Sequence, residues 1–371
     1  MPTSATATRY GYLPNPWLCD AAGRVTFLGE AQIGLVERYG PDCQAEIERL
    51  STEADHLDRS GLLPTWEQAW LTVRMVRSLG SYSIAPVGRT EASMLGYGLG
   101  WSAVCPIRYG LDFDGGGTGI WNLQPPTFLV GERTIGLLRC GYGKLDDLGE
   151  LDADPDRVVL VSDPLMDAID GLDAVLGERG ICRLPPTGSP EREPLVEWLM
   201  EHGPQAIWLR DLMSPRTLKL AAPVTLGELA DAIALDRCPY ERIGAYRDGG
   251  MSWSQPIVDH LGSTRGLCLY QEQLFGLAVE LGRFSWQEAD ALRKAVGKRQ
   301  VEALGRMNRR FVERAGDHVA SPDEANRLWH EVAAHPKALR SHSLQLASLL
   351  CDAADLHIRT RIGPEDGGIP T

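Results

Sequence analysis

The chain has 371 residues, 43% of them hydrophobic and 23% charged, so it can bury a substantial core in one elaborate or two modest domains. No apolar run reaches the ~18 to 20 residues that a membrane helix needs, and the start MPTSATATRY lacks a signal-peptide core, so we expect a cytoplasmic protein outside the membrane. The formal net charge of −13 argues against avid nonspecific DNA binding, which depends on Lys and Arg at the phosphates.

The first half of the chain changes pattern twice. Residues 1–30 are punctuated by Pro and Gly and are expected to be irregular, whereas residues 31–80 follow a helical pattern. The polar faces of these helices are expected to carry Glu46, Glu48 and Glu53. Within residues 81–180, short β-branched runs at Thr134–Leu138 and Val158–Val161 are typical of strands.

The second half is predicted to be mainly helical. Helical patterns with Gly and Pro breaks cover residues 181–357, and the tail IGPEDGGIPT is expected to be disordered. The eight cysteines are scattered without a CxxC pair or a His at zinc spacing. We interpret them as reduced thiols and expect no zinc site and no disulfide.

Several segments follow one another in the order of a known family. The stretch LYQEQLFGLAVELGRFSWQEADALRKAVGK (Leu269–Lys298) resembles the fingers of the bacterial DNA polymerase III alpha subunit, which read YQEQ, an apolar helix and EADLLRRAMGKK. LGYGLGWSAVCPIRYGLDF (Leu95–Phe113) is similar to AYALGITDLDPIRYGLLF of that family, and RSHSLQLASLLCDAADLH (Arg340–His357) to NKSHAVAYALLAYQTAYLKAH. The resemblance covers roughly residues 31–358.

The resemblance implies an α+β fold, in which a small mixed palm sheet flanked by helices is followed by a mainly helical fingers lobe. The expected parts are an irregular N-terminal segment (1–30), a palm-like domain with a helical lead-in (31–183), a palm-to-fingers connection with a helical fingers-like domain (184–358) and a disordered tail (359–371). Members of the family are normally about three times longer, so we expect a truncated palm-and-fingers core.

The resemblance also shows a departure at the catalytic strand. Polymerases hold two metal ions with carboxylates, and the family supplies two of them from a PDFDIDF-like strand. Here Pro126 is followed by Thr127-Phe128-Leu129-Val130, so Thr127 and Leu129 stand where the aspartates are expected. Asp163, after a β-branched run, is the retained third carboxylate and the one expected ligand for Mg²⁺. One carboxylate does not make a two-metal site.

Other carboxylates are candidates to rebuild the site. Asp112 and Asp114 have the Asp-x-Asp spacing that places two side chains on one face of a strand, although a solvated Gly-rich turn explains them equally. Glu132 follows the catalytic strand, where a surface residue at a strand end is the alternative. Glu91 lies in the shortened counterpart of the family's GRGSAAGS loop, where it would repel a triphosphate unless a metal lay between them.

Basic and loop residues are candidates to bind phosphate. The resemblance assigns this role to Gly88, Arg89, Ser93, Arg237, Arg293, Lys294, Lys298, Arg340 and His342. For Arg293 and Lys294 the alternative is a solvated helix face paired with Glu288 and Asp290, and for Arg237 a capping or salt-bridge role. The stretch from Arg293 to Arg314 is the most basic, although its apolar spacing also suits an ordinary amphipathic helix.

Three function classes remain open. The first is a polymerase III alpha-like protein that binds nucleotide or, weakly, nucleic acid and has lost most or all DNA synthesis. The second is a repurposed enzyme that uses the pocket for metal-dependent nucleotidyl transfer or condensation of a small molecule. The third is a noncatalytic decoy or regulator of the replisome. The sequence leaves both the presence of catalysis and the oligomeric state open.

Overall fold

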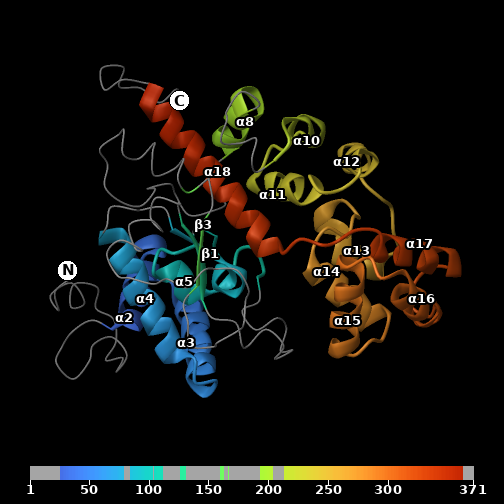
Figure 1. Cartoon of the computed structure of the whole chain (residues 1–371), viewed down its shortest axis with the longest axis horizontal. Coiled ribbons are helices and arrows are strands. Elements are labelled where there is room, and N and C mark those ends of the chain that lie inside the picture. The colour runs from blue at the N-terminus through green and yellow to red at the C-terminus, as the bar shows by residue number, and fades with distance from the viewer. Residues whose placement is uncertain are drawn as a thin grey trace. The chain divides into compact units, whose positions relative to one another are not determined.

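The computed structural model describes residues 26–78, 84–102, 104–111, 126–130, 159–162, 166, 193–203 and 213–361. The chain divides into two compact units, one of Met1–Leu195 with Ser348–Thr371 and one of Val196–Ala347 (Figure 1). Within the described residues, no helix combines the length and the apolar character that crossing a membrane would require.

Helices make up most of the described part of the first unit. They are α2 (Phe27–Tyr39), α3 (Gln44–Arg59), α4 (Leu63–Ser78), η1 (Gly88–Ala92) and α5 (Met94–Gly98). Helix α2 begins at Phe27 because the Thr26 hydroxyl accepts the amide N–H of Gly29 at 3.0 Å. It ends at Gly40, whose φ of 81° is accessible to glycine at little cost.

The core of this unit forms where α2, α3, α4 and α5 meet. Trp66 stacks on Trp101 with 5.9 Å between ring centroids, and Phe128 meets Trp101 edge-on at 5.1 Å. Helices α2 and α5 cross at glycines, because a Cβ added to Gly34 would lie 1.9 Å from the carbonyl oxygen of Gly98. The two backbones are therefore in direct contact.

Three short strands accompany these helices. They are β1 (Ile84–Val87), β2 (Thr127–Val130) and β3 (Val159–Ser162), in the order β1-β2-β3. Strand β2 pairs antiparallel with β1 and parallel with β3, with Thr127 opposite Val159 and Val130 opposite Ser162. Each strand has only four residues.

The expected α+β fold class, with a palm sheet flanked by helices, is wrong for the part of the chain that the structure describes. That part is mainly helical, and its strands amount to three pieces of four residues. The prediction rested on the family resemblance. Of the two β-branched runs, Val158–Val161 overlaps strand β3, and β-branched residues favour strands less reliably than periodicity favours helices. One of those runs, Thr134–Leu138, lies outside the described residues.

Helices make up most of the described part of the second unit. After α8 (Glu193–His202) come α10 (Pro215–Ala221), α11 (Leu226–Leu235), α12 (Tyr240–Arg247), α13 (Gln255–Leu261), η4 (Gly262–Thr264), α14 (Gln271–Gly276), the π-helical η5 (Leu277–Leu281), α15 (Trp286–Gly297), α16 (Val301–Gly316) and α17 (Pro322–Ala333). Helix α18 (Arg340–Arg361) begins in this unit.

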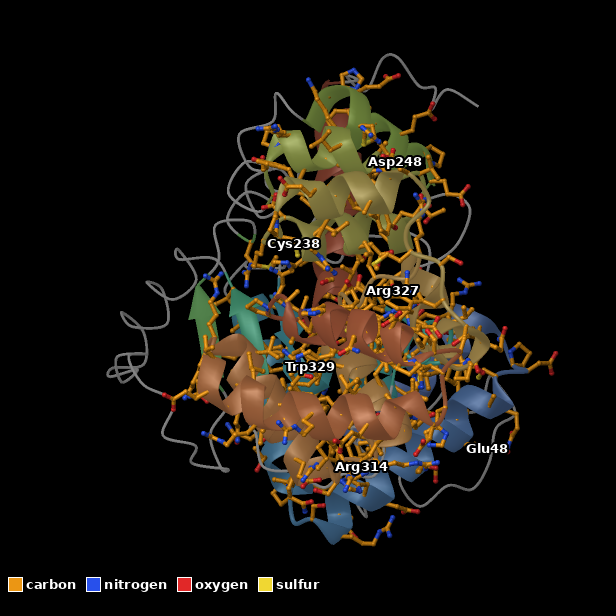
Figure 2. All side chains as sticks on the ribbon, turned by 90° about the vertical axis from the view of Figure 1, so that its right-hand side faces the viewer. Glu48, Cys238, Asp248, Arg314, Arg327 and Trp329 are labelled. Atoms are coloured by element: carbon orange, nitrogen blue, oxygen red, sulfur yellow. The ribbon has the colours of Figure 1, made fainter. Side chains whose placement is uncertain are left out.

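Local side-chain caps explain where many of these helices start. Ser214, Thr225, Ser285 and Ser321 each accept a backbone N–H from the first turn of the following helix. The Ser285 amide in turn donates to the Glu288 carboxylate, which completes a capping box. The core beneath α15, α16 and α17 contains Phe284, Phe311 and Trp329, the last of which is labelled in Figure 2.

Candidate functional site

Two segments that lie far apart in the sequence meet at the start of α18. The amide of Gln271 donates to the carbonyl of Ala338 at 2.8 Å, and the amide of Ala338 donates to the carbonyl of Leu269 at 3.0 Å. The amide of Arg340 donates to the Glu272 carboxylate, with oxygen distances of 3.2 and 3.3 Å. The structure therefore brings the Tyr-Gln-Glu-Gln turn and the Arg-Ser-His segment together, and we call this contact the 270–340 joint.

The buried carboxylate of Asp231 accepts hydrogen bonds from two tyrosines, one of which, Tyr270, belongs to the joint. The hydroxyl of Tyr270 donates to Asp231 Oδ1 at 2.6 Å, and the hydroxyl of Tyr246 donates to Asp231 Oδ2 at 2.8 Å. Burial raises the pKa of Asp231, whereas the two tyrosine hydrogen bonds and the charge of Arg340 lower it. Asp231 thus fixes the position of Tyr270 and places negative charge near Arg340.

A second buried cluster anchors the residues that lead into α18. Arg242 contacts both carboxylate oxygens of Glu331, one of them at 2.8 Å from Nη1. Glu331 also accepts the amide of Cys268 at 2.7 Å, and its backbone carbonyl accepts Lys337 Nζ at 3.0 Å. Burial lowers the pKa of Lys337 below its ordinary value. Because the Lys337 carbonyl in turn accepts Gln271 Nε2 at 3.1 Å, the cluster and the joint are continuous.

The basic residues of α15 share one carboxylate. Arg293 Nη2 lies 2.8 Å from Asp290 Oδ1, and Lys294 Nζ lies 2.7 Å from Asp290 Oδ2. Burial alone would raise the pKa of Asp290, but the two cations bring it below its ordinary value. Lys298 lies exposed at the end of the same helix. These pairs are the local ones that the solvated-face alternative predicts, although Lys294 keeps 60% of its side chain exposed.

The loop from Gly88 to Ser93 is attached to a carboxylate of the protein itself. The amides of Met94 and Leu95 donate to Glu53 at 3.0 and 3.1 Å, and the Ser93 hydroxyl donates to it at 2.9 Å. Arg49 Nε also donates to the Glu53 carboxylate, at 2.8 Å. Burial raises the pKa of Glu53, while the Met94 amide and Arg49 lower it.

The prediction that Glu53 lies on a polar face is therefore wrong. Glu53 is only 1% exposed, and its carboxylate takes the place at the start of α5 where an anion would approach the free amides. Glu91, a candidate from the sequence, is also fully buried. Neither arrangement has a signal in the sequence, because the helical periodicity of α3 gives no indication of which polar residue faces another helix.

Comparison with known proteins finds a match within the second unit. Residues 215–318 match the family model of the bacterial DNA polymerase III alpha subunit finger domain. Over this stretch the chain is similar to DNA polymerase III alpha subunits and error-prone DNA polymerases. The sequence resemblance is thereby confirmed, and the matched residues run from α10 to just past the end of α16.

Individual relatives match shorter or overlapping stretches. An error-prone DNA polymerase of Corynebacterium diphtheriae is 38% identical over 104 residues, which is 27% of this chain and 10% of that protein. An error-prone DNA polymerase of Corynebacterium glutamicum is 34% identical over 148 residues, which is 36% of this chain and 14% of that protein. A DNA polymerase III subunit alpha of Thermus aquaticus is 40% identical over 75 residues, which is 20% of this chain and 6% of that protein. The matches thus span 6–14% of the length of these curated relatives.

The matched stretch contains part of the 270–340 joint and of the residues that support it. Asp231, Tyr246 and Tyr270 belong to it, whereas Arg340 and His342 follow it on α18. Of the residues predicted from the sequence, the structure brings Arg340 to the joint and leaves Arg237 exposed on the turn before α12. Asp231 and Tyr246 escaped the sequence analysis, and their only signal is an Asp within the apolar run ELADAIAL.

Four predicted carboxylates cannot be placed. Asp112, Asp114, Glu132 and Asp163 lie outside the described residues, and so does the side chain of Arg89. Strand β3 ends at Ser162, directly before Asp163, beside the strand that holds Thr127 and Leu129. Within the described ranges, no three His, Cys, Asp or Glu side chains form a group that could hold a metal ion. The expectation of Mg²⁺ concerns Asp163 and stays a prediction.

Proposed function

We propose that the chain binds nucleotide and nucleic acid through its finger domain and the adjoining start of α18, and that its capacity for DNA synthesis is lost or strongly reduced. The observation that carries the proposal is the 270–340 joint. It gathers Arg340 and the Tyr-Gln-Glu-Gln turn of a matched polymerase finger domain into one rigid contact.

Arg340 is the residue on which phosphate binding should depend most. Across the ranges that the structure describes, its guanidinium enters no ion pair, while its amide is held by Glu272. A guanidinium binds phosphate through two parallel N–H bonds, which are stronger than neutral hydrogen bonds. Because Asp231 and the Glu331 cluster fix the backbone on both sides of the joint, little further ordering is needed when a phosphate binds.

Two observations support reduced synthesis. Thr127 and Leu129 stand where the family resemblance expects the two strand aspartates, and neither residue type can hold a catalytic metal ion. In addition, the amides at the start of α5 are occupied by Glu53, in the loop that the resemblance assigns to the triphosphate. A triphosphate would have to displace a buried carboxylate to use these donors.

The test is a titration of a fluorescent deoxynucleoside triphosphate against the wild-type chain, Arg340→Ala and Arg247→Ala. Arg247 is the matched control, because it is an exposed arginine of the same unit whose partner Asp248 lies at the surface (Figure 2). We expect Arg340→Ala to weaken binding by about tenfold or more, the value of a hydrogen bond between charged groups. Equal affinities of the two variants would overturn the phosphate-binding role.

Primer extension with Mg²⁺ or Mn²⁺ tests the second part of the proposal. We expect the wild-type chain to extend a primer far more slowly than a DNA polymerase III alpha subunit assayed beside it. Robust metal-dependent extension that disappears in Asp163→Ala would show that a catalytic site has been rebuilt around this carboxylate, and would contradict the loss of synthesis.

A further inference from the structure

An aromatic and basic patch on the stretch that matches the finger domain shares no residue with the 270–340 joint. We call it the 216–240 patch, and its members are Arg216, Lys219, Arg237 and Tyr240. The guanidinium carbon of Arg216 lies 3.9 Å from the centroid of the Tyr240 ring. Even with this cover, Tyr240 is 45% exposed, so part of its ring is accessible to a ligand.

Backbone contacts explain why these residues share one surface. The amide of Ser214, the N-cap of α10, donates to Asp236 Oδ1 at 3.1 Å, which ties the start of α10 to the turn before α12. Arg216 follows Ser214 on α10, and Tyr240 is the first residue of α12. Figure 1 shows the two helices next to α11, and Cys238, labelled in Figure 2, marks the turn that carries Arg237.

The cations of the patch remain available to a ligand. Arg216, Lys219 and Arg237 are exposed, and in the described part of the chain none of them forms an ion pair. The neighbouring carboxylates are Asp236, which accepts the Ser214 amide, and the exposed Glu241. Positive charge therefore exceeds negative charge at the exposed ring.

We propose that the 216–240 patch binds single-stranded nucleic acid, with one unpaired base stacked on the Arg216–Tyr240 pair. Arginine planes and aromatic rings both stack on bases, and each stacked base contributes a free energy that depends little on sequence. Lys219 and Arg237 contact the flanking phosphates. A duplex keeps its bases stacked inside, so it can use the cations but not the ring.

The proposal deepens the proposed function, on which it rests, by naming the form of the nucleic acid and a second place of contact. It assigns roles to Arg216, Lys219 and Tyr240, which the sequence analysis had left without one. It also gives Arg237 a phosphate partner outside the 270–340 joint.

The experiment measures fluorescence anisotropy of the full chain with short oligothymidylate, an abasic oligonucleotide of the same length, oligouridylate and a blunt duplex. We expect Tyr240→Ala to weaken binding to oligothymidylate by about tenfold and to leave the abasic strand unchanged, since stacking is lost and the charges remain. Tyr240→Phe keeps the ring and should restore the affinity. Arg247→Ala serves as the charge control, and thermal unfolding confirms that each variant is folded.

Three results would overturn the proposal: equal wild-type affinity for abasic and thymidylate strands, tighter binding of the duplex, or full affinity in Tyr240→Ala. Tight binding of oligouridylate or of oligothymidylate supports it, and the ratio between them tells whether RNA or DNA fits better. The nucleotide titration of Arg340→Ala is independent of Tyr240. A loss there with no effect at Tyr240 would leave the proposed function standing and remove this inference.

Discussion

At the scale of single residues, Glu53 is the clearest case of a charge used inside the protein. Its carboxylate accepts four donors, namely the Arg49 guanidinium, the Ser93 hydroxyl and the amides of Met94 and Leu95. A buried carboxylate is costly unless its oxygens are satisfied in this way. The contact therefore fixes α3 to the start of α5 and keeps those amides occupied.

We predict that Glu53→Ala lowers the free energy of unfolding by about 3 kcal/mol, because the substitution leaves buried donors without an acceptor. Chemical denaturation followed by circular dichroism measures the change. Glu48→Ala is the control on the same helix, where the exposed carboxylate accepts a hydrogen bond from Gln44, and it should change stability by about 0.5 kcal/mol or less. Similar effects of both substitutions would contradict the role of Glu53.

At the scale of elements, the crossing of α2 and α5 depends on two glycines. A Cβ on Gly34 would meet the Gly98 carbonyl oxygen at 1.9 Å, and a Cβ on Gly98 would meet the Ala31 carbonyl oxygen at 2.5 Å. Both neighbours are backbone atoms, so neither can move aside without shifting a helix. Close packing of helices at this crossing therefore tolerates no side chain larger than hydrogen.

We predict that Gly34→Ala destabilises the protein by about 3 kcal/mol through overpacking. Gly305→Ala is the matched control in the interior of α16, where an added Cβ meets no atom within 4 Å. It should stabilise the protein by about 0.5–1 kcal/mol, since alanine favours the helix more than glycine does. Thermal unfolding of both variants measures the two changes in stability. An unchanged stability of Gly34→Ala would show that the helices can separate to accept a side chain.

At the scale of the whole molecule, charge is divided unevenly between the units. Val196–Ala347 contains 19 Lys and Arg residues and 19 Asp and Glu residues, so the net charge of −13 comes from the remainder of the chain. The overall charge therefore argues less strongly against nucleic-acid binding by the finger domain than it first suggests. Local basic surfaces can attract phosphates on an acidic protein.

We predict that the affinity for oligothymidylate falls with salt concentration, with a slope of log K against log salt of about −2, because each phosphate contact to a single strand contributes about −0.7. Lys219→Ala should reduce the magnitude of the slope by about 0.7. Tyr240→Ala should weaken binding and leave the slope unchanged. A slope near zero in the wild type would mean that the exposed cations do not reach phosphates.

The helices and the family could be predicted from local pattern, but the site could be predicted only in part. The segment around Tyr270 was recognisable because a long run of residues retains its order. The pairing of Arg293 and Lys294 with Asp290 follows from spacing along one helix, so it was foreseen as an alternative. The predicted strand content was too high, because it was taken from the family resemblance and the described strands have only four residues each.

The sequence by itself determined the helical character of the second unit and the polymerase III alpha resemblance, which expects aspartates where Thr127 and Leu129 stand. Only the tertiary structure decided that Asp231 lies beneath Tyr270 and that Glu53 occupies the start of α5. The physical reason is the distance along the chain over which each kind of interaction acts. Periodicity and capping act within one or two helical turns, whereas these contacts join residues about 40 positions apart, and their partners are chosen by how helices pack.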